Sequence, residues 1–133
     1  MDNVILKFLN KNNIFYQLIE HPPIFTMQHA TKISDLSLQE GVKSLLLKSK
    51  NNYLLIVLRG DKKLNSKKLK KLLQLKDLRF ATPDEVKNIM RCEIGSCFPF
   101  ANLIDVQMIV DKNLQNNKLI SFTPGVHTKS IKM

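Results

Sequence analysis

The sequence has little cysteine and little glycine, and both shortages exclude classes of site. Its two cysteines, Cys92 and Cys97, form neither a Cys-x-x-Cys pair nor a cysteine and histidine cluster that would hold structural zinc. Four glycines leave little room for a glycine-rich phosphate loop, and no Gly-x-x-x-x-Gly-Lys motif occurs. Carboxylates do not pair at a spacing that suggests acid and base chemistry. The sequence therefore predicts neither a bound metal nor a cofactor.

Long apolar runs are missing as well. No stretch approaches the length of a membrane span. Residues 1–13 lack both the basic region and the apolar run of a secretory signal peptide. Two unpaired thiols are typical of a reducing compartment. We therefore expect a cytoplasmic protein with no membrane partner.

Acidic residues are scarce relative to basic ones. The chain has 21 Lys and Arg against 11 Asp and Glu, which gives a net charge of +10 over 133 residues. Such a surface attracts polyanions, and nucleic acid is the commonest polyanion in the cytoplasm. The hydrophobic content of 44% and the chain length suit one globular domain over residues 1–133.

Periodicity and turn residues predict mixed helices and strands. Apolar residues at helical spacing predict a helix over 4–9, capped by Asp2 or Asn3, and branched and aromatic residues predict a strand over 14–19. Strands over 44–50 and 53–58 are predicted to form a tight hairpin through Asn51-Asn52. Further strands are predicted over 78–81, 106–110, 119–122 and 130–133. Because helices and strands do not alternate regularly, we expect an α+β fold with a mixed sheet.

Two threonines are predicted to cap helices. Thr26 precedes a short helix over 27–33. Thr82 begins the clearest local pattern in the chain, in which Pro83 takes the first helical position and Glu85 closes a capping box. This pattern predicts a helix from Pro83 that ends before Gly95.

A third helix is predicted to be amphipathic over 65–75, with Leu69, Leu72 and Leu73 on its inner face. Its outer face carries four lysines: Lys67, Lys68, Lys70 and Lys71. These lysines are either a solvated face or a surface that follows nucleic-acid phosphates, and the sequence leaves both interpretations open.

Lys43 lies where a loop becomes a buried strand, directly before the apolar run 45–47. One interpretation is that its side chain extends to solvent from the end of the strand. The other is that it is a fixed cation at the mouth of a pocket that binds an anion.

The segment Gly95-Ser96-Cys97-Phe98-Pro99 has two interpretations. Glycine lets backbone approach a ligand closely and proline stiffens the exit, so the loop could direct amide N–H groups at a carbonyl oxygen. It could equally be a plain connector. The two thiols would be nucleophiles only with a histidine in reach, and buried inert thiols are the alternative.

Several segments together resemble one family in order and spacing. They read HPPIFT at 21–26, VKSLLLK at 42–48, RGDKKLNSKKLKKLL at 59–73, RFATPDEVKNI at 79–89, GSCFP at 95–99 and VD at 110–111. Over nearly its whole length the chain resembles the YbaK-like family and the inserted editing domain of bacterial prolyl-tRNA synthetase. The resemblance implies a mixed, largely antiparallel sheet curled into a pseudo-barrel with flanking helices. It also implies hydrolysis of the ester in a mischarged aminoacyl-tRNA.

The resemblance further implies roles for individual residues. Lys43 matches the motif lysine near the terminal adenosine and its phosphate, and the loop from Gly95 carries the amides that face the ester carbonyl. The predicted catalytic residues are thus Lys43, Gly95 and Ser96. The predicted substrate-binding residues are His21, Thr26, Ser44, Cys97, Phe98, Pro99, Asp111, Thr123 and Gly125. The predicted contacts to the tRNA acceptor stem are Lys67, Lys68, Lys70 and Lys71, and no metal site is implied.

Two features depart from the family pattern. Some relatives carry a Phe-His-Pro segment where this chain reads Phe122-Thr123-Pro124, and His127 lies nearby but not at the matching position. The identity of the edited amino acid is therefore left open. The chain also ends at Met133, where relatives usually continue through a final helix, so its last sheet edge could be exposed.

The sequence therefore predicts a trans-acting aminoacyl-tRNA deacylase. The expected carrier is tRNA-Pro, bound through its acceptor end, with alanine, cysteine and serine as candidate acyl groups. An association with prolyl-tRNA synthetase and the oligomeric state are left open. One alternative is a non-catalytic tRNA-binding or regulatory module with the same fold, and another is a hydrolase of small aminoacyl or cysteinyl compounds.

Overall fold

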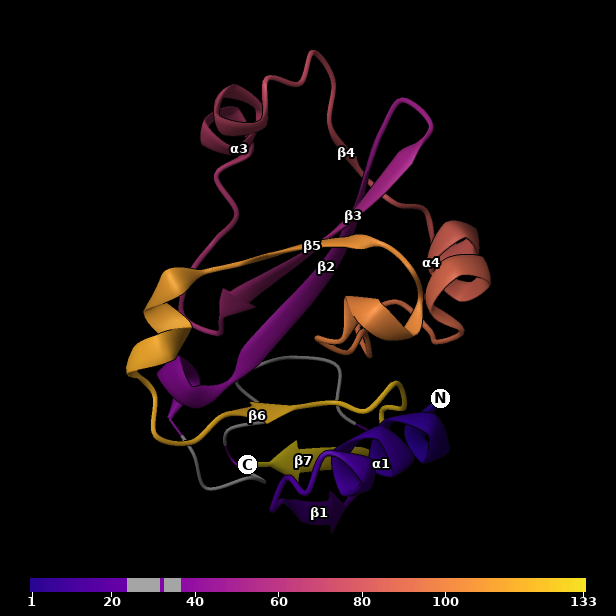
Figure 1. The fold of residues 1–133 in the computed structure, drawn as a ribbon, viewed down its shortest axis with the longest axis vertical. Coiled ribbons are helices and arrows are strands. Elements are labelled where there is room, and N and C mark those ends of the chain that lie inside the picture. The colour runs from indigo at the N-terminus through magenta and orange to yellow at the C-terminus, as the bar shows by residue number, and fades with distance from the viewer. Residues whose placement is uncertain (24–31, 33–36) are drawn as a thin grey trace.

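The computed structural model describes residues 1–23, 32 and 37–133. As predicted, the described chain mixes helices and strands, and its strands form two sheets (Figure 1). The three-stranded sheet β1-β7-β6 lies beside α1, and the four-stranded sheet β4-β2-β3-β5 is flanked by α3 and α4. In chain order the elements are α1 (Asp2–Lys11), β1 (Gln17–Glu20), η1 (Leu38–Glu40), β2 (Val42–Ser49), β3 (Asn52–Arg59), α3 (Ser66–Leu73), β4 (Arg79–Phe80), α4 (Pro83–Met90), η2 (Ala101–Leu103), β5 (Gln107–Val110), η3 (Lys112–Asn116), β6 (Ser121–Phe122) and β7 (Lys129–Lys132).

The antiparallel pair β2 and β3 is the centre of the four-stranded sheet. Its register runs from Val42 opposite Arg59 to Ser49 opposite Asn52. The turn is therefore Lys50-Asn51 rather than the predicted Asn51-Asn52, because Asn52 already pairs with Ser49. Lys50 takes the left-handed conformation, with a φ of 53°, which such a short turn requires.

The outer strands make this sheet mixed. β4 pairs antiparallel with β2, whereas β5 runs parallel beside β3. A parallel neighbour needs a long crossover, and here the chain passes through α3, β4, α4 and η2 before it returns as β5. The predicted mixed α+β fold is thus confirmed for the described residues.

Side chains along β2 and β3 alternate between the two faces of this sheet, as in any regular strand. One face carries Val42, Leu46, Leu55 and Val57, which belong to the main core with Phe98, Phe122 and Ile131. The other face carries Leu47, Leu54 and Ile56, which pack with Leu69 of α3. The sheet therefore separates two apolar clusters.

The three-stranded sheet is antiparallel throughout, with β7 between β1 and β6. The first strand begins at Gln17, later than predicted, and Phe15 before it is 94% exposed. A single parallel bridge between Gly41 and Ser121 links this sheet to the start of β2. The described strands form no closed barrel, so the pseudo-barrel stays a prediction.

The helices agree with their predicted apolar faces except at Val4 and Leu72. Ile5 and Leu9 of α1 are buried as expected, but Val4 is 44% exposed, and Met1 occupies the N-cap instead of Asp2 or Asn3. In α3 Leu69 is buried, whereas Leu72 is 72% exposed. Leu69 and Leu73 lie four residues apart on one side of this two-turn helix, so Leu72 turns away from the sheet.

Left-handed residues other than glycine close several elements. Asn13, Lys50, Gln74, Arg91 and Asp105 all have φ values between 53° and 56°. Gln74 ends α3 and Arg91 ends α4. Because glycine is the usual residue at such positions, the low glycine content has a structural cost at each of these turns.

None of the described helices is long and apolar enough to cross a lipid bilayer.

Glu85 ties α4 to three strands. Its carboxylate accepts hydrogen bonds from the Thr82 amide at 2.9 Å and from the Tyr53 hydroxyl at 2.8 Å, and the Arg79 guanidinium binds it at 2.7 Å. The Lys48 ammonium lies 3.2 Å away. The predicted capping box is thereby confirmed. These donors, Arg79 first among them, hold the pKa of Glu85 far below its ordinary value of 4.5.

Glu85→Gln is expected to lower the free energy of unfolding at neutral pH and to flatten its dependence on pH in acid. The depressed pKa means that the unfolded chain binds this proton first, so the stabilisation is present above pH 4.5 and is lost as the pH falls below it. Urea unfolding between pH 7 and pH 3 measures both effects. Asp84→Asn is the matched control, since no ion pair to Asp84 is found in the described chain. An unchanged acid slope in Glu85→Gln would contradict the assignment.

Candidate functional site

Two loops far apart in the sequence, 95–99 and 123–127, pack against each other. The Thr123 hydroxyl donates to the Cys97 carbonyl at 3.4 Å. A Cβ built on Gly125 would lie 3.5 Å from Cδ1 of Phe98 and 3.7 Å from Cβ of Cys92. The structure thus brings together Cys97, Phe98, Thr123 and Gly125, four of the residues that the resemblance implied.

Gly95 is held in a conformation that favours glycine. Its φ is +89°, and a Cβ at this position would lie 3.3 Å from Cε1 of His127. The His127 side chain is only 10% exposed, and its Nε2 lies 3.7 Å from a carboxylate oxygen of Glu93. In the sequence, His127 is distinguished only by its place near Thr123. Its contact with Gly95 joins segments more than thirty residues apart, which no local pattern signals.

Ser96 is held by the turn that follows α4. Its side chain is fully buried, and both its amide and its hydroxyl donate to the Glu93 carbonyl, at 3.1 and 2.8 Å. The turn thus uses both donors of Ser96 in this conformation, and the predicted catalytic role of Ser96 stays a prediction. Phe98 is also fully buried and belongs to the main core. Its predicted role in substrate binding likewise stays a prediction.

The two thiols are free and buried next to each other. A hydrogen bond with the Cys92 sulfur, together with burial, raises the pKa of Cys97 far above the ordinary thiol value. The same bond lowers the pKa of Cys92. The predicted role of the amides of loop 95–99 at the ester carbonyl stays a prediction.

Lys43 projects from the other face of the four-stranded sheet. Its partner across the hairpin is Leu58, which packs with the α3 cluster, whereas the neighbouring Val42 belongs to the main core. The half-buried Lys43 ammonium donates to the Lys62 carbonyl at 2.5 Å. No contact in the described chain joins Lys43 to loop 95–99. The predicted catalytic role of Lys43 stays a prediction.

Ser44 faces the main core, where strand alternation places it opposite to Lys43. Its hydroxyl is buried and has no hydrogen-bond partner within the described chain. Buried hydroxyls are usually hydrogen-bonded, so the Ser44 hydroxyl is an exception within the described chain. Its predicted role in substrate binding stays a prediction.

His21 and Asp111 are both held by structural hydrogen bonds. His21 Nδ1 lies 2.8 Å from the Pro22 carbonyl, which can only accept, so this nitrogen carries a proton. His21 Nε2 lies 2.8 Å from the Ser130 hydroxyl. Asp111 caps η3 by accepting from the Asn113 amide at 3.0 Å. Thr26 lies outside the described residues.

A cavity of about 350 Å³ opens beside loop 95–99 at the end of α4. We call it the α4 cleft. Ser96 and Gly125 line it together with Lys87, Arg91, Glu93 and His127. A neighbouring hollow of about 410 Å³ shares Lys87, Glu93 and His127 with it. The α4 cleft therefore contains two of the predicted site residues, Ser96 and Gly125.

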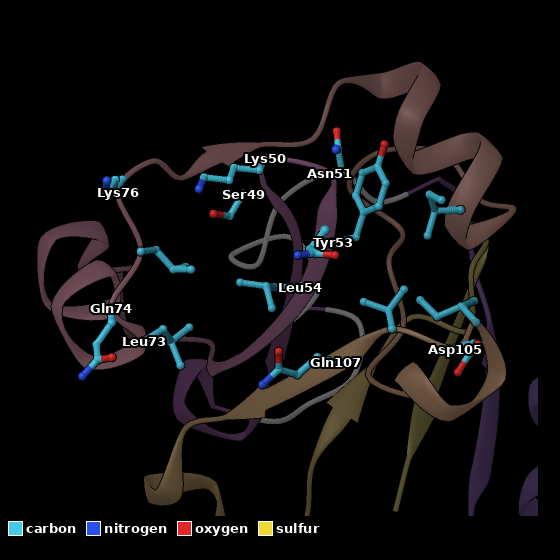
Figure 2. A pocket seen from close by; sticks show the side chains of 15 residues that line it. Ser49, Lys50, Asn51, Tyr53, Leu54, Leu73, Gln74, Lys76, Asp105 and Gln107 are labelled. Carbon is cyan, nitrogen blue, oxygen red and sulfur yellow. The ribbon is translucent and has the colours of Figure 1, made fainter.

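A larger cavity, of about 790 Å³, lies elsewhere among the described residues (Figure 2). It opens at the hairpin tip, with Leu54 and Tyr53 facing it, Gln74 and Lys76 on the α3 side and Asp105 on the opposite side. None of the predicted site residues lines it. Volume alone therefore does not identify the functional site.

The four lysines of α3 lie on the outer side of the four-stranded sheet. Lys67, Lys68 and Lys71 are exposed and Lys70 is half-buried. They share this side with Lys43, because α3 packs on the same face through Leu69. Within residues 1–23, 32 and 37–133, no three His, Cys, Asp or Glu side chains gather in a group that could hold a metal ion.

A family model of the aminoacyl-tRNA editing domain matches residues 21–133. The chain belongs to this family. The match confirms the resemblance seen in the sequence, and it includes both packed loops, the α4 cleft and Lys43.

Relatives of two kinds are similar to the chain. The prolyl-tRNA editing protein ProX of Acetoanaerobium sticklandii is 28% identical over 134 aligned residues, which cover 96% of this chain and 81% of ProX. The proline–tRNA ligase of Kosmotoga olearia is 30% identical over 118 residues, or 86% of this chain and 20% of the ligase. That of Geobacillus sp. (strain WCH70) is 33% identical over 86 residues, 65% of this chain and only 15% of the ligase.

The fold also matches solved structures. The crystal structure of a candidate trans-editing enzyme for prolyl tRNA synthetase superposes with a TM-score of 0.87 at 20% identity, over 99% of this chain and 85% of that chain. At this level of identity the likeness concerns the fold. The arrangement of strands and helices in the editing-domain family is therefore preserved here.

Gly95→Ala is expected to destabilise the protein by about 1–2 kcal/mol, because alanine resists a positive φ and its Cβ would press on His127. His127→Ala removes the imidazole and with it the close contact to the added Cβ. Gly95→Ala should therefore cost less in a His127→Ala background than alone, which a double-mutant cycle of urea unfolding measures. Strictly additive effects would show that the two residues do not touch.

Proposed function

We propose that this protein hydrolyses the ester bond of mischarged aminoacyl-tRNA in trans. The observation that carries the proposal is the match of the editing-domain family to residues 21–133. The name of ProX, a relative aligned over nearly this whole chain, supports prolyl-tRNA editing as the process. The preserved fold of a candidate trans-editing enzyme supports the same assignment.

The reaction needs little chemical assistance from the protein. Water attacks the ester carbonyl, the bond between that carbon and the ribose oxygen breaks, and the ribose oxygen takes up a proton. An aminoacyl ester is already activated, so positioning and polarisation of its carbonyl can suffice, with a ribose hydroxyl as a further aid. Gly95, exposed and without a side chain, lets the ester approach the backbone of loop 95–99. Thr123, Pro99 and Gly125 border the approach.

Lys43 and the α3 lysines are assigned to tRNA binding. The Lys43 ammonium has three N–H donors and uses one on the Lys62 carbonyl, so the others can bind a phosphate oxygen. Lys67, Lys68, Lys70 and Lys71 lie on the same side of the sheet. Together they would hold backbone phosphates of the acceptor stem, a duplex large enough to extend past the edge of the sheet.

Alanine, cysteine and serine on tRNA-Pro are the proposed substrates. An added methylene changes binding in an apolar pocket by only about 1–3 kcal/mol, so steric exclusion of proline is the effective way to spare the correct product. Thr123 stands where some relatives carry histidine, and its hydroxyl already bonds to the Cys97 carbonyl. We also propose that residues 1–133 act as one editing domain in the cytoplasm, with the Gly41–Ser121 bridge closing the two sheets into a pseudo-barrel.

One observation favours a second candidate, a tRNA-binding module without activity. Both donors of Ser96 are used by the Glu93 carbonyl. If these bonds persist with RNA bound, Ser96 offers no donor to stabilise an oxyanion. Such a protein would protect aminoacyl-tRNA in proportion to its own concentration and would not turn it over.

Turnover separates the two candidates. Ala-, Cys-, Ser- and Pro-charged tRNA-Pro are each incubated in large excess over the protein, and the remaining ester is followed with time. We expect multiple turnovers on at least one mischarged species, with Pro-tRNA-Pro spared. Binding without turnover on any of the four would establish the inactive module.

Lys43→Ala is expected to raise KM for the preferred substrate about tenfold and to leave kcat nearly unchanged, because a phosphate contact is present in both ground state and transition state. Steady-state deacylation kinetics measure the two constants separately. Lys50→Ala, which removes an exposed lysine from the tip of the same hairpin, is the matched control. Wild-type kinetics in Lys43→Ala would remove Lys43 from the site.

A further inference from the structure

The end of α4 lies next to loop 95–99, whereas α3 does not. Only three residues separate Arg91, the C-cap of α4, from Gly95. The α3 lysines lie beyond the four-stranded sheet, because α3 packs on its outer face and Cys97 and Phe98 belong to the core on its inner face. In Figure 1 α3 and α4 flank the sheet on opposite sides. An RNA end that reaches loop 95–99 therefore needs contacts other than those from α3.

Two cations stand at the α4 cleft without a carboxylate partner in the described chain. Arg59 and Arg79 each bind a carboxylate, of Asp61 and Glu85, at 2.7 Å. Arg91, the third arginine of the sequence, forms no such pair among the described residues, and neither does Lys87. Both are exposed and line the cleft. A free guanidinium fork fits phosphate oxygens through two parallel hydrogen bonds.

The walls of the cleft also suit a nucleotide. Its volume of about 350 Å³ falls at the lower end of the range for small-molecule pockets, which excludes a duplex and admits a single nucleotide. The nearly buried His127 ring lies on one wall, between Gly95 and Glu93. The carboxylates here are Glu93 and, in the adjoining hollow, Asp84. Glu93 is 81% exposed, so solvent screens its charge.

We propose that the α4 cleft binds the single-stranded 3′ end of the RNA, with Lys87 and Arg91 contacting its phosphates. This inference rests on the proposed function, since it takes loop 95–99 as the place where the ester lies. It divides the basic surface into two parts. Lys43 and α3 hold the stem, and the end of α4 guides the terminal nucleotides to the loop.

The test is equilibrium binding of deacylated RNA, so that it does not depend on hydrolysis. One probe is a tRNA-Pro acceptor minihelix with its complete single-stranded 3′ end, and the other is the same duplex with that end removed. Fluorescence anisotropy gives the affinity of each at several salt concentrations. The protein variants are Lys87→Ala/Arg91→Ala and, as a charge-matched control, Lys112→Ala/Lys118→Ala, whose exposed lysines lie in and beside η3, across the molecule from α4 (Figure 1).

We expect Lys87→Ala/Arg91→Ala to bind the complete minihelix about tenfold more weakly than the wild type at 0.1 M salt. The slope of log K against log salt concentration should fall in magnitude by about 1.4 for this variant, since each lost phosphate contact to a single strand removes about 0.7. The blunt duplex should bind both proteins equally. The single variant Arg91→Lys should keep the wild-type salt slope but bind more weakly than the wild type. Lysine keeps the positive charge but cannot form two parallel hydrogen bonds as the guanidinium does.

An unchanged salt slope, or an equal loss on the blunt duplex, would overturn the inference. An equal loss of affinity in Lys112→Ala/Lys118→Ala would also overturn it, because the loss would then follow from the net charge of the protein and not from the α4 cleft. A thermal melt of each variant excludes unfolding as the cause. If the 3′-end effect is found in a protein that does not deacylate, the α4 cleft stands and the proposed hydrolysis falls. If the protein deacylates tRNA but Lys87→Ala/Arg91→Ala does not weaken binding of the 3′ end, the proposed hydrolysis stands and the role of the α4 cleft falls.

Discussion

The alternation of side chains along β2 and β3 is the constraint on which the arrangement of the molecule depends. Adjacent residues of a strand must face opposite sides of a sheet, and both sides of this sheet are covered by apolar clusters. Lys43 is therefore committed to the α3 side by the same geometry that commits Val42 and Ser44 to the core. A slip of one residue in the register would turn Lys43 towards the main core and Val42 and Ser44 towards α3. The separation of the basic surface from loop 95–99 follows from this register.

Local patterns predicted local structure well. The threonine, proline and glutamate at 82–85 form the expected capping box, because all the bonds involved lie within four residues of the chain. The mixed α+β fold and the long hairpin also followed from periodicity and turn residues. The hairpin turn was off by one residue, since an Asn-Asn pair signals a turn without fixing which residue takes the positive φ.

Interactions between distant segments could not be predicted from the residues alone. Nothing local indicates that β5 pairs parallel with β3, or that His127 lies over Gly95. The family resemblance identified the residues of loop 95–99 and of segment 123–125, and these two loops do meet. The resemblance did not indicate that the amide and the hydroxyl of Ser96 both donate to the Glu93 carbonyl. That choice depends on the conformation of a five-residue turn, which composition does not determine.

The left-handed residues that end the helices leave this protein room to gain stability. Gln74 ends α3 with a φ of 56°, a conformation that costs a residue with a side chain about 1 kcal/mol relative to glycine. Gln74 lies on the far side of the sheet from both loops. Glycine there would raise the tolerance of the fold for other substitutions. A sequence that uses so little glycine can therefore still gain stability by single substitutions, and at Gln74 such a substitution touches no residue assigned to RNA or to the ester.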